Sequence, residues 1–110
     1  MELFTIEQIG GGSTFIAKIE PSHKIFEGHF PQNPVVPGVC TMAMIKDCCS
    51  HLLSRTVRYD YVKEVKFLSA IIPTVHKKLS VAIDIDEQMN LKANIVYGEQ
   101  VLLKLKAVIK

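Results

Sequence analysis

The sequence predicts an α+β fold in which one long helix packs against a curved antiparallel β-sheet. One segment, residues 38–54, has apolar residues at three- and four-residue spacing, and no other segment does. Three consecutive segments in the second half alternate apolar and polar residues, which predicts an antiparallel meander with one buried face. The chain has 110 residues, of which 48% are hydrophobic. That is enough for one core, so we expect a single domain over residues 1–110.

A short hairpin is expected at the N-terminus. Residues 1–8 alternate weakly, and the three glycines at 10–12 tolerate the positive φ angles of a turn. Residues 13–20 form the second strand, which Pro21 ends. No helix follows the glycines, so they predict a turn and not a phosphate-binding loop.

Residues 23–39 are predicted to be a rigid, non-helical segment. Each of its three prolines fixes φ and disfavours helical geometry at the residue before it. The segment presents one imidazole, His29, and then runs into the start of the helix at Gly38. Amide groups at a helix start stabilise negative charge on an oxygen, so this arrangement suits chemistry on a carbonyl group.

The predicted helix over residues 38–54 has an apolar and a polar face. The apolar stripe that should face the sheet consists of Val39, Met42, Ile45, Cys48, Cys49, Leu52 and Leu53. The opposite arc contains Lys46, Asp47, Ser50, His51 and Ser54. One such helix must cover the whole sheet.

Four strands are predicted after the helix. Residues 59–71 are rich in β-branched and aromatic side chains and end before Pro73. Strict alternation follows at residues 79–86, 91–97 and 101–110. Gly98 and Glu99 separate the last two strands and predict a hairpin turn.

Composition and charge exclude several classes of protein. The net charge of +2 is too small to indicate nucleic-acid binding. No apolar run approaches the roughly 20 residues that span a bilayer, and no signal-peptide pattern is present, so no membrane insertion is expected. Three cysteines, two of them adjacent, predict neither disulfides nor a metal or redox pair, which fits a reducing cytoplasm. The lysines of the second half are expected on solvated strand faces or, alternatively, in a basic rim that docks an acidic carrier protein.

The proline-rich segment resembles the signature of the hot-dog β-hydroxyacyl-[acyl-carrier-protein] dehydratases of bacterial fatty-acid synthesis. The matching residues are Phe26-x-Gly28-His29-Phe30-Pro31-x-x-Pro34-x-x-Pro37-Gly38-Val39. The resemblance implies a homodimer that pairs two sheets edge to edge and builds its active sites across the interface, with a higher oligomer or a hetero-pair left open. It also implies that His29 is catalytic and that the amides around Gly38 and Val39 bind the thioester carbonyl. Phe30 and Pro37 would lie beside the substrate, and no cofactor or metal is implied.

One position departs from the pattern of that family. The family carries Glu or Asp five residues after the glycine of Pro-Gly, where this chain has Ala43. Alanine can line a substrate site but cannot transfer a proton. One turn further along the helix, where the family usually carries glutamine, the chain has Asp47. Asp47 is either a solvated helix charge, which could pair with His51, or a relocated catalytic acid near His29 at the dimer interface.

Other candidate residues have simpler interpretations. Cys40 lies at the helix start, where a thiolate is favoured, but we interpret it as a small buried hydrophobe. Met42, Met44 and Met89 suit a core or the lining of an acyl channel equally well. The remaining histidines lack the setting of His29 and are expected to be structural: His23, His51 and His76.

Three functions are compatible with these residues. The first is a dehydratase, or the reverse hydratase, of β-hydroxyacyl thioesters carried on acyl-carrier protein or coenzyme A, in a specialised lipid, polyene or polyketide-type pathway. The second is a hot-dog acyl thioesterase in which Asp47 activates water. The third is a catalytically degenerate partner subunit that binds acyl thioesters, because Ala43 replaces the usual acid.

Overall fold

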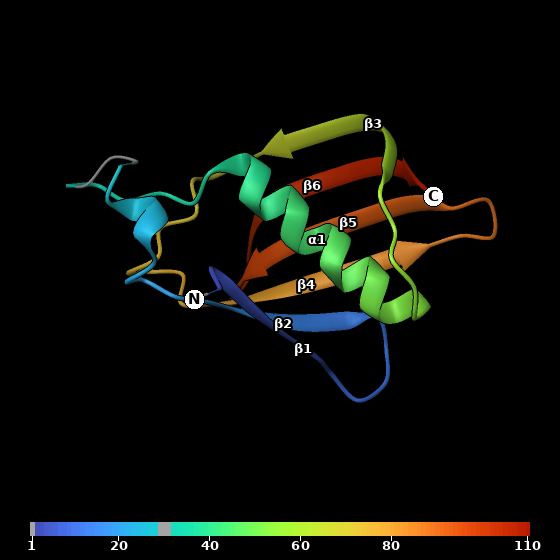
Figure 1. The fold of residues 1–110 in the computed structure, drawn as a ribbon, viewed down its shortest axis with the longest axis horizontal. Coiled ribbons are helices and arrows are strands. Elements are labelled where there is room, and N and C mark those ends of the chain that lie inside the picture. Colours follow the sequence, from blue (N-terminus) through green and yellow to red (C-terminus); the bar gives the residue numbers. More distant parts are fainter. Residues whose placement is uncertain (1, 29–31) are drawn as a thin grey trace.

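A computed structural model describes residues 2–28 and 32–110 of the chain. Its elements in order are β1 (Phe4–Gln8), β2 (Thr14–Ile19), a 3-10 turn η1 (Lys24–Phe26), α1 (Gly38–Leu53), β3 (Tyr59–Phe67), β4 (Lys78–Ile85), β5 (Asn90–Tyr97) and β6 (Gln100–Ile109). The strands form one six-stranded antiparallel sheet in the order β1-β2-β4-β5-β6-β3. Helix α1 crosses one face of this sheet (Figure 1). The predicted α+β class is therefore confirmed.

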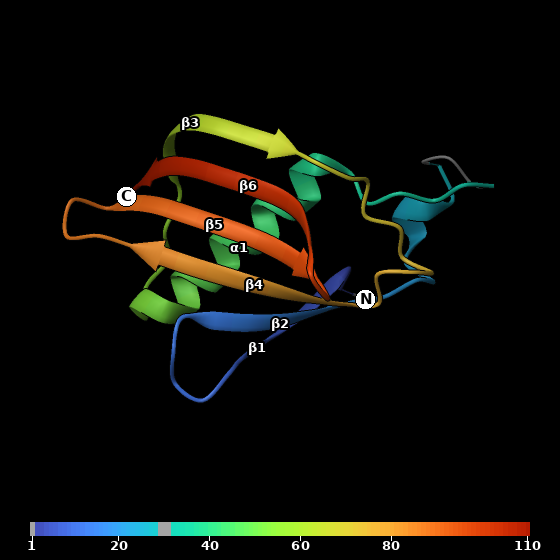
Figure 2. The same ribbon diagram turned by 180° about the vertical axis from the view of Figure 1, so that it is seen from behind.

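The core lies between α1 and the sheet. The strictly alternating strands predicted in the second half are present as β4, β5 and β6, and their apolar positions face the helix. Leu79, Ile95 and Leu103, one from each of these strands, are fully buried. The polar positions of the same strands lie on the opposite face, which no described helix covers (Figure 2).

Both predicted hairpin turns are confirmed. Strands β1 and β2 pair from Phe4 with Ile19 to Gln8 with Phe15. Gly10 in that turn has a φ of 61°, and Gly98 between β5 and β6 has a φ of 60°. Glycine adopts these left-handed angles without the steric penalty of a side chain.

The buried stripe of α1 differs from the predicted one at its N-terminal end. Ile45, Cys48 and Cys49 are buried as expected. Val39 is 76% exposed, however, and Thr41 and Met44 occupy the inner positions. The reason is helical geometry: two successive three-residue steps from Ile45 back to Val39 rotate by roughly 120° around an axis with 3.6 residues per turn. Val39 therefore points away from the sheet.

Strand β3 is shorter than the predicted strand of residues 59–71. It ends at Phe67, because the next two amides both donate to the carbonyl oxygen of Leu102 and the chain then leaves the ladder. The carbonyl oxygen of Ile71 accepts a hydrogen bond from the amide of Val36, 2.8 Å away. The last part of the predicted strand thus ties the proline-rich segment to the sheet.

One turn of 3-10 helix interrupts the segment predicted to be non-helical. It spans Lys24–Phe26, and the Nδ1 atom of His23 caps it by accepting a hydrogen bond from the amide of Ile25 at 3.0 Å. The prolines that oppose helical geometry begin only at Pro31, so they do not act on this turn. Within residues 2–28 and 32–110, no helix is both long enough and apolar enough to cross a bilayer.

Candidate active site

The candidate site surrounds the start of α1. Pro37 has extended backbone angles and is the N-cap, so the helix begins at Gly38 as predicted. The amides of Cys40 and Thr41 donate to the carbonyl oxygen of Pro37, at 3.0 and 3.3 Å. The amides of Gly38 and Val39 donate to no acceptor in the part of the chain that the structure describes. Two such N–H groups at the positive end of a helix can receive the oxygen of a carbonyl group.

Phe67, the last residue of β3, covers Gly38. A Cβ atom on Gly38 would lie only 2.8 Å from the Cζ atom of Phe67, so glycine allows the ring to lie against the backbone. Phe67 is 55% exposed, and Val39 and Leu68 are exposed as well. Phe67 was not among the predicted site residues, because nothing in its segment distinguishes it from the other apolar residues of the strand.

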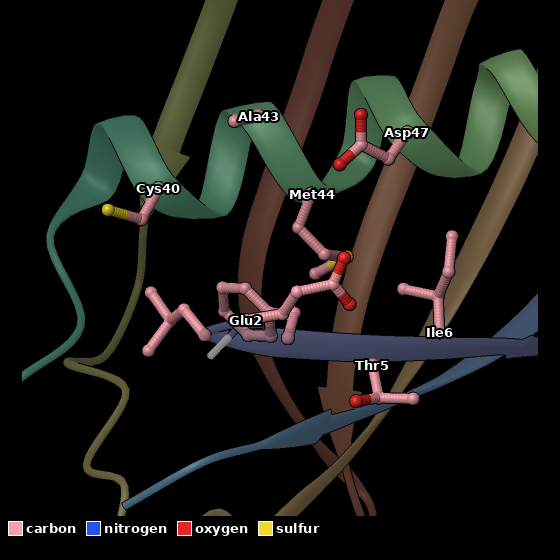
Figure 3. Close-up of a pocket in the computed structure, with 9 residues that line it drawn as sticks. Glu2, Thr5, Ile6, Cys40, Ala43, Met44 and Asp47 are labelled. Carbon is pink, nitrogen blue, oxygen red and sulfur yellow. The ribbon is translucent and has the colours of Figure 1, made fainter. Parts of the chain in front are cut away.

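A pocket of about 530 Å³ lies between α1 and β1 (Figure 3). Its lining residues come from the helix and from the N-terminal strand: Glu2, Leu3, Phe4, Thr5, Ile6, Cys40, Ala43, Met44 and Asp47. Met44 points from α1 toward β1 and is 2% exposed, so it forms the floor of the pocket. The strand side of this pocket was not predicted from the sequence.

Ala43 and Asp47 lie on one face of α1, and both are exposed and line this pocket. Asp47 makes no hydrogen bond and no ion pair with any described residue. The predicted pair between His51 and Asp47 is therefore not formed. The ring of His51 lies edge-on to the ring of Phe15, with the ring centroids 5.7 Å apart. A carboxylate without a partner can transfer a proton to a substrate. A solvated charge on a helix surface would also have no partner. Both interpretations of Asp47 therefore stay predictions.

The cysteine thiols near the site are poor nucleophiles. Burial raises the pKa of Cys48 to about 12 and that of Cys49 to about 11, and desolvation also raises the pKa of Cys40. A raised pKa keeps a thiol protonated near neutral pH, whereas the nucleophile is the thiolate. Cys40 is half-buried and acts as part of the pocket wall, in agreement with its interpretation as a small hydrophobe.

Two residues of the predicted site, His29 and Phe30, lie outside the described residues, as does Pro31 of the same motif. The catalytic role of His29 thus stays a prediction. His76, one of the histidines expected to be structural, is buried, and its Nδ1 atom accepts a hydrogen bond from the amide of Ile72 at 2.9 Å. Among the residues that the structure describes, no group of three or more His, Cys, Asp or Glu side chains is placed to hold a metal ion.

Comparison with known sequences finds dehydratases. A family model described as ApeI-like, ApeI dehydratase, matches residues 7–103. Two curated relatives are 3-hydroxyacyl-[acyl-carrier-protein] dehydratases FabZ. The protein of Lactobacillus helveticus is 26% identical over 76 residues, and that of Ligilactobacillus salivarius is 30% identical over 88 residues. The matches cover 67% and 72% of this chain but 50% and 63% of the relatives, so the chain spans about half to under two thirds of their length.

Two solved structures share the fold. One is the dehydratase heterocomplex ApeI:P from Xenorhabdus doucetiae, with a TM-score of 0.75 at 23% identity over 96% of this chain and 93% of that chain. The other is an uncharacterized protein from Erwinia carotovora subsp. atroseptica, with a TM-score of 0.67 at 18% identity over 96% and 89%. At these identities the likeness concerns the fold alone. It confirms the hot-dog arrangement of one helix against a curved antiparallel sheet.

Proposed function

The chain belongs to the ApeI-like family of hot-dog dehydratases, and on this premise we propose that it dehydrates β-hydroxyacyl thioesters or runs the reverse hydration. The observation that carries the proposal is the pair of unpaired amides at Gly38 and Val39, at the start of α1. Dehydration removes a proton from the α-carbon and the hydroxyl group from the β-carbon, so negative charge develops on the thioester oxygen. Two amide donors at a helix start stabilise that charge.

His29 and Asp47 would transfer the two protons. The imidazole of His29 would take the α-proton, a role that suits histidine because its unperturbed pKa lies near neutrality. The carboxylic acid form of Asp47 gives a proton to the departing hydroxyl group, which leaves as water. The products are an enoyl thioester and water, and the proton held by His29 returns to Asp47 through solvent.

Gly38 and Asp47 of one chain are too far apart to act on one substrate. They are nine residues apart on α1, about 13.5 Å along the helix axis. The carbonyl carbon and the β-carbon of a thioester are only two bonds apart. A site that uses both groups must therefore take Gly38 from one chain and Asp47 from another, which supports a homodimer with shared active sites.

The free edge of β3 is suited to such a dimer. Strand β3 ends the sheet, and among the described strands it pairs only with β6. Its large apolar side chains Tyr61, Val62 and Phe67 are 54%, 37% and 55% exposed. An unpaired strand edge with apolar side chains is a template for a second copy of the same strand. A homologous chain could take the same place, and the ApeI:P structure from Xenorhabdus doucetiae is described as a heterocomplex.

The substrate would arrive on an acyl-carrier protein, docked on the face of the sheet opposite α1. Lys66 of β3 lies opposite Lys104 of β6, and Lys92 of β5 lies opposite Lys106. Like charges directly opposite one another destabilise a sheet. Glu64, which is 3.2 Å from Lys66 and lies opposite Lys106, offsets part of this repulsion, and an acidic partner would relieve the rest. Lys66 directly precedes Phe67, and the ring of Phe67 lies against Gly38 at the start of α1. The lysine surface is therefore one residue along β3 from the proposed carbonyl site. The arrangement supports the basic-rim interpretation of these lysines.

Product analysis tests the proposal against its alternatives. The purified protein is mixed with a β-hydroxyacyl group on acyl-carrier protein, and the enoyl product and free thiol are measured separately. Enoyl product without free thiol is the expected result. Free thiol without enoyl product would identify a thioesterase. Binding of the acyl carrier or of a homologous chain without any turnover would identify the degenerate partner subunit, the second candidate function, which Ala43 favours.

A further inference from the structure

His76 lies in the loop between β3 and β4 and has no role in the steps proposed above. We propose that it is a positioning residue for the carbonyl site: its imidazole fixes the loop that holds Val36, and through Val36 it sets the direction of the amides at Gly38 and Val39. The inference rests on the proposed function, because it takes these two amides to bind the thioester oxygen. It adds a side chain from a different part of the sequence to that site.

The imidazole of His76 organises its own loop. Its Nδ1 atom accepts a hydrogen bond from the amide of Ile72 at 2.9 Å, and the amide of His76 donates to the carbonyl oxygen of Ile72 at 2.7 Å. One residue thus closes the turn at 73–75 through both its side chain and its backbone. His76 is buried, so a side chain without an acceptor at this place would leave the Ile72 amide without a partner and with little access to water.

The same loop holds the segment that leads into α1 (Figure 1). The carbonyl oxygen of Ile71, directly before Ile72, accepts a hydrogen bond from the amide of Val36 at 2.8 Å. Ile71 and Val36 are both buried. Pro34 and Pro37 have no amide hydrogen, so this segment has few backbone donors with which to bind the rest of the fold. The position of Val36 therefore depends on the position of the loop.

Pro37 passes the position of Val36 on to the carbonyl site. Pro37 is the N-cap of α1, with a φ of −60° and a ψ of 140°. Its ring restricts φ, so the direction of the next amide, that of Gly38, follows from the place of Val36. A displacement of such donors by about 1 Å is enough to weaken the stabilisation of charge in a transition state.

A second contact of the same ring defines the alternative role. The ring of His76 lies edge-on to that of Tyr97 at the end of β5, with the ring centroids 4.8 Å apart. If this packing were the only role, another aromatic side chain would serve equally well. If the acceptor is required, asparagine should serve instead, because its Oδ1 atom is as many bonds from the backbone as the Nδ1 atom of histidine. The two roles predict opposite results for the same pair of variants.

The pair His76→Phe and His76→Asn tests the inference without any turnover. His76→Phe keeps an aromatic ring and loses the acceptor, whereas His76→Asn keeps the acceptor and loses the ring. Amide hydrogen exchange is followed by NMR spectroscopy. Relative to the amides of the central strand β5, the Val36 amide should exchange at least about tenfold faster in His76→Phe and at the wild-type rate in His76→Asn. The chemical shifts of the Gly38 and Val39 amides should move only in His76→Phe.

Ser50→Ala is the matched control. The hydroxyl of Ser50 accepts a hydrogen bond from the amide of Val57 at 3.0 Å, so this too is a side-chain acceptor for a backbone amide, but near the other end of α1. The variant should lower stability without changing the relative exchange of Val36, which separates positioning from general destabilisation. If His76→Phe does not fold, His76→Leu removes the same acceptor with less bulk. Wild-type exchange of Val36 in the variant without the acceptor, or faster exchange in His76→Asn than in that variant, would overturn the inference.

Kinetic measurements connect the loop to the reaction. With a β-hydroxyacyl thioester, kcat of His76→Phe should fall about tenfold while KM changes less than about twofold, because the lost interaction is one with the transition state. His76→Asn and Ser50→Ala should keep the wild-type kcat. A rise in KM alone, or an equal loss of kcat in all three variants, would overturn the positioning role. Absence of turnover in the wild type would instead refute the proposed function, and the exchange and shift measurements would still decide whether His76 holds the loop.

Discussion

The ring of Phe67 lies against Gly38, so the last residue of β3 limits the space at the first residue of α1. The amide of Gly38 is the proposed donor to the thioester oxygen. The packing of an edge strand and the geometry of the carbonyl site are thus connected through a single contact.

Replacing Gly38 by alanine should disturb this contact more than it disturbs the fold. The added Cβ must displace the ring of Phe67, which is half exposed and can move, so the free energy of unfolding should change by less than about 1 kcal/mol. Turnover should fall about tenfold or more because the amide site is displaced. The double variant Gly38→Ala/Phe67→Ala should recover part of the activity if the two residues are coupled. Full activity in Gly38→Ala alone would show that the contact is irrelevant to catalysis.

Asp47→Asn tests the relocated acid. Asparagine has nearly the same shape but cannot give a proton, so kcat should fall about 100-fold. Stability should change by less than about 0.5 kcal/mol, because Asp47 is exposed and has no partner among the described residues. Asp84→Asn, an exposed carboxylate on β4, is the control and should leave turnover unchanged. Wild-type turnover in Asp47→Asn would identify Asp47 as a solvated helix charge.

Stability should decrease at alkaline pH. Burial raises the pKa of Cys48 to about 12 and of Cys49 to about 11, from 9.0, and it also raises the pKa of Tyr59. The unfolded chain ionises first, so the stabilisation is complete below about pH 8 and declines as the pH rises from 9 through 11 toward 12. Urea unfolding at about pH 8 and about pH 10.5 measures this slope. Replacing Cys48 and Cys49 by alanine should flatten it, and an unchanged slope would refute this explanation.

Ser54→Gly should stabilise the fold. Ser54 ends α1 in the left-handed conformation with a φ of 54°, which glycine adopts more easily. The side chain is exposed, so the free energy of unfolding should rise by about 1 kcal/mol. Ser50→Gly is the opposing control: the hydroxyl of Ser50 accepts a hydrogen bond from the amide of Val57 at 3.0 Å, and this variant should destabilise. A destabilised Ser54→Gly would contradict the assignment of the helix end.

Local patterns in the sequence were sufficient for most of the fold. The period-two strands and the helix starting at Gly38 follow from the residues themselves, because side chains alternate along a strand and repeat along a helix. The end of β3 could not be predicted, since it depends on hydrogen bonds to Leu102, a residue distant in the sequence. The exposure of Val39 could have been predicted, because six residues along a helix place Val39 roughly 120° around the axis from the buried Ile45.

The candidate site was only partly predictable. The shared helix face of Ala43 and Asp47 follows from their four-residue spacing. The strand side of the pocket does not, because Phe4 and Ile6 reach α1 only after the N-terminal hairpin has paired with the rest of the sheet. Likewise, the contact of Phe67 with Gly38 joins residues that no periodicity relates.

The most direct test of the central claim is the turnover of a β-hydroxyacyl thioester by the wild type and by His29→Ala, followed by the absorbance of the enoyl product. His51→Ala, which changes an exposed histidine on α1, serves as the control. We expect the wild type and His51→Ala to form enoyl thioester at similar rates and His29→Ala to be at least about 100-fold slower. Full activity in His29→Ala, or no enoyl product from the wild type, would contradict the proposed dehydratase.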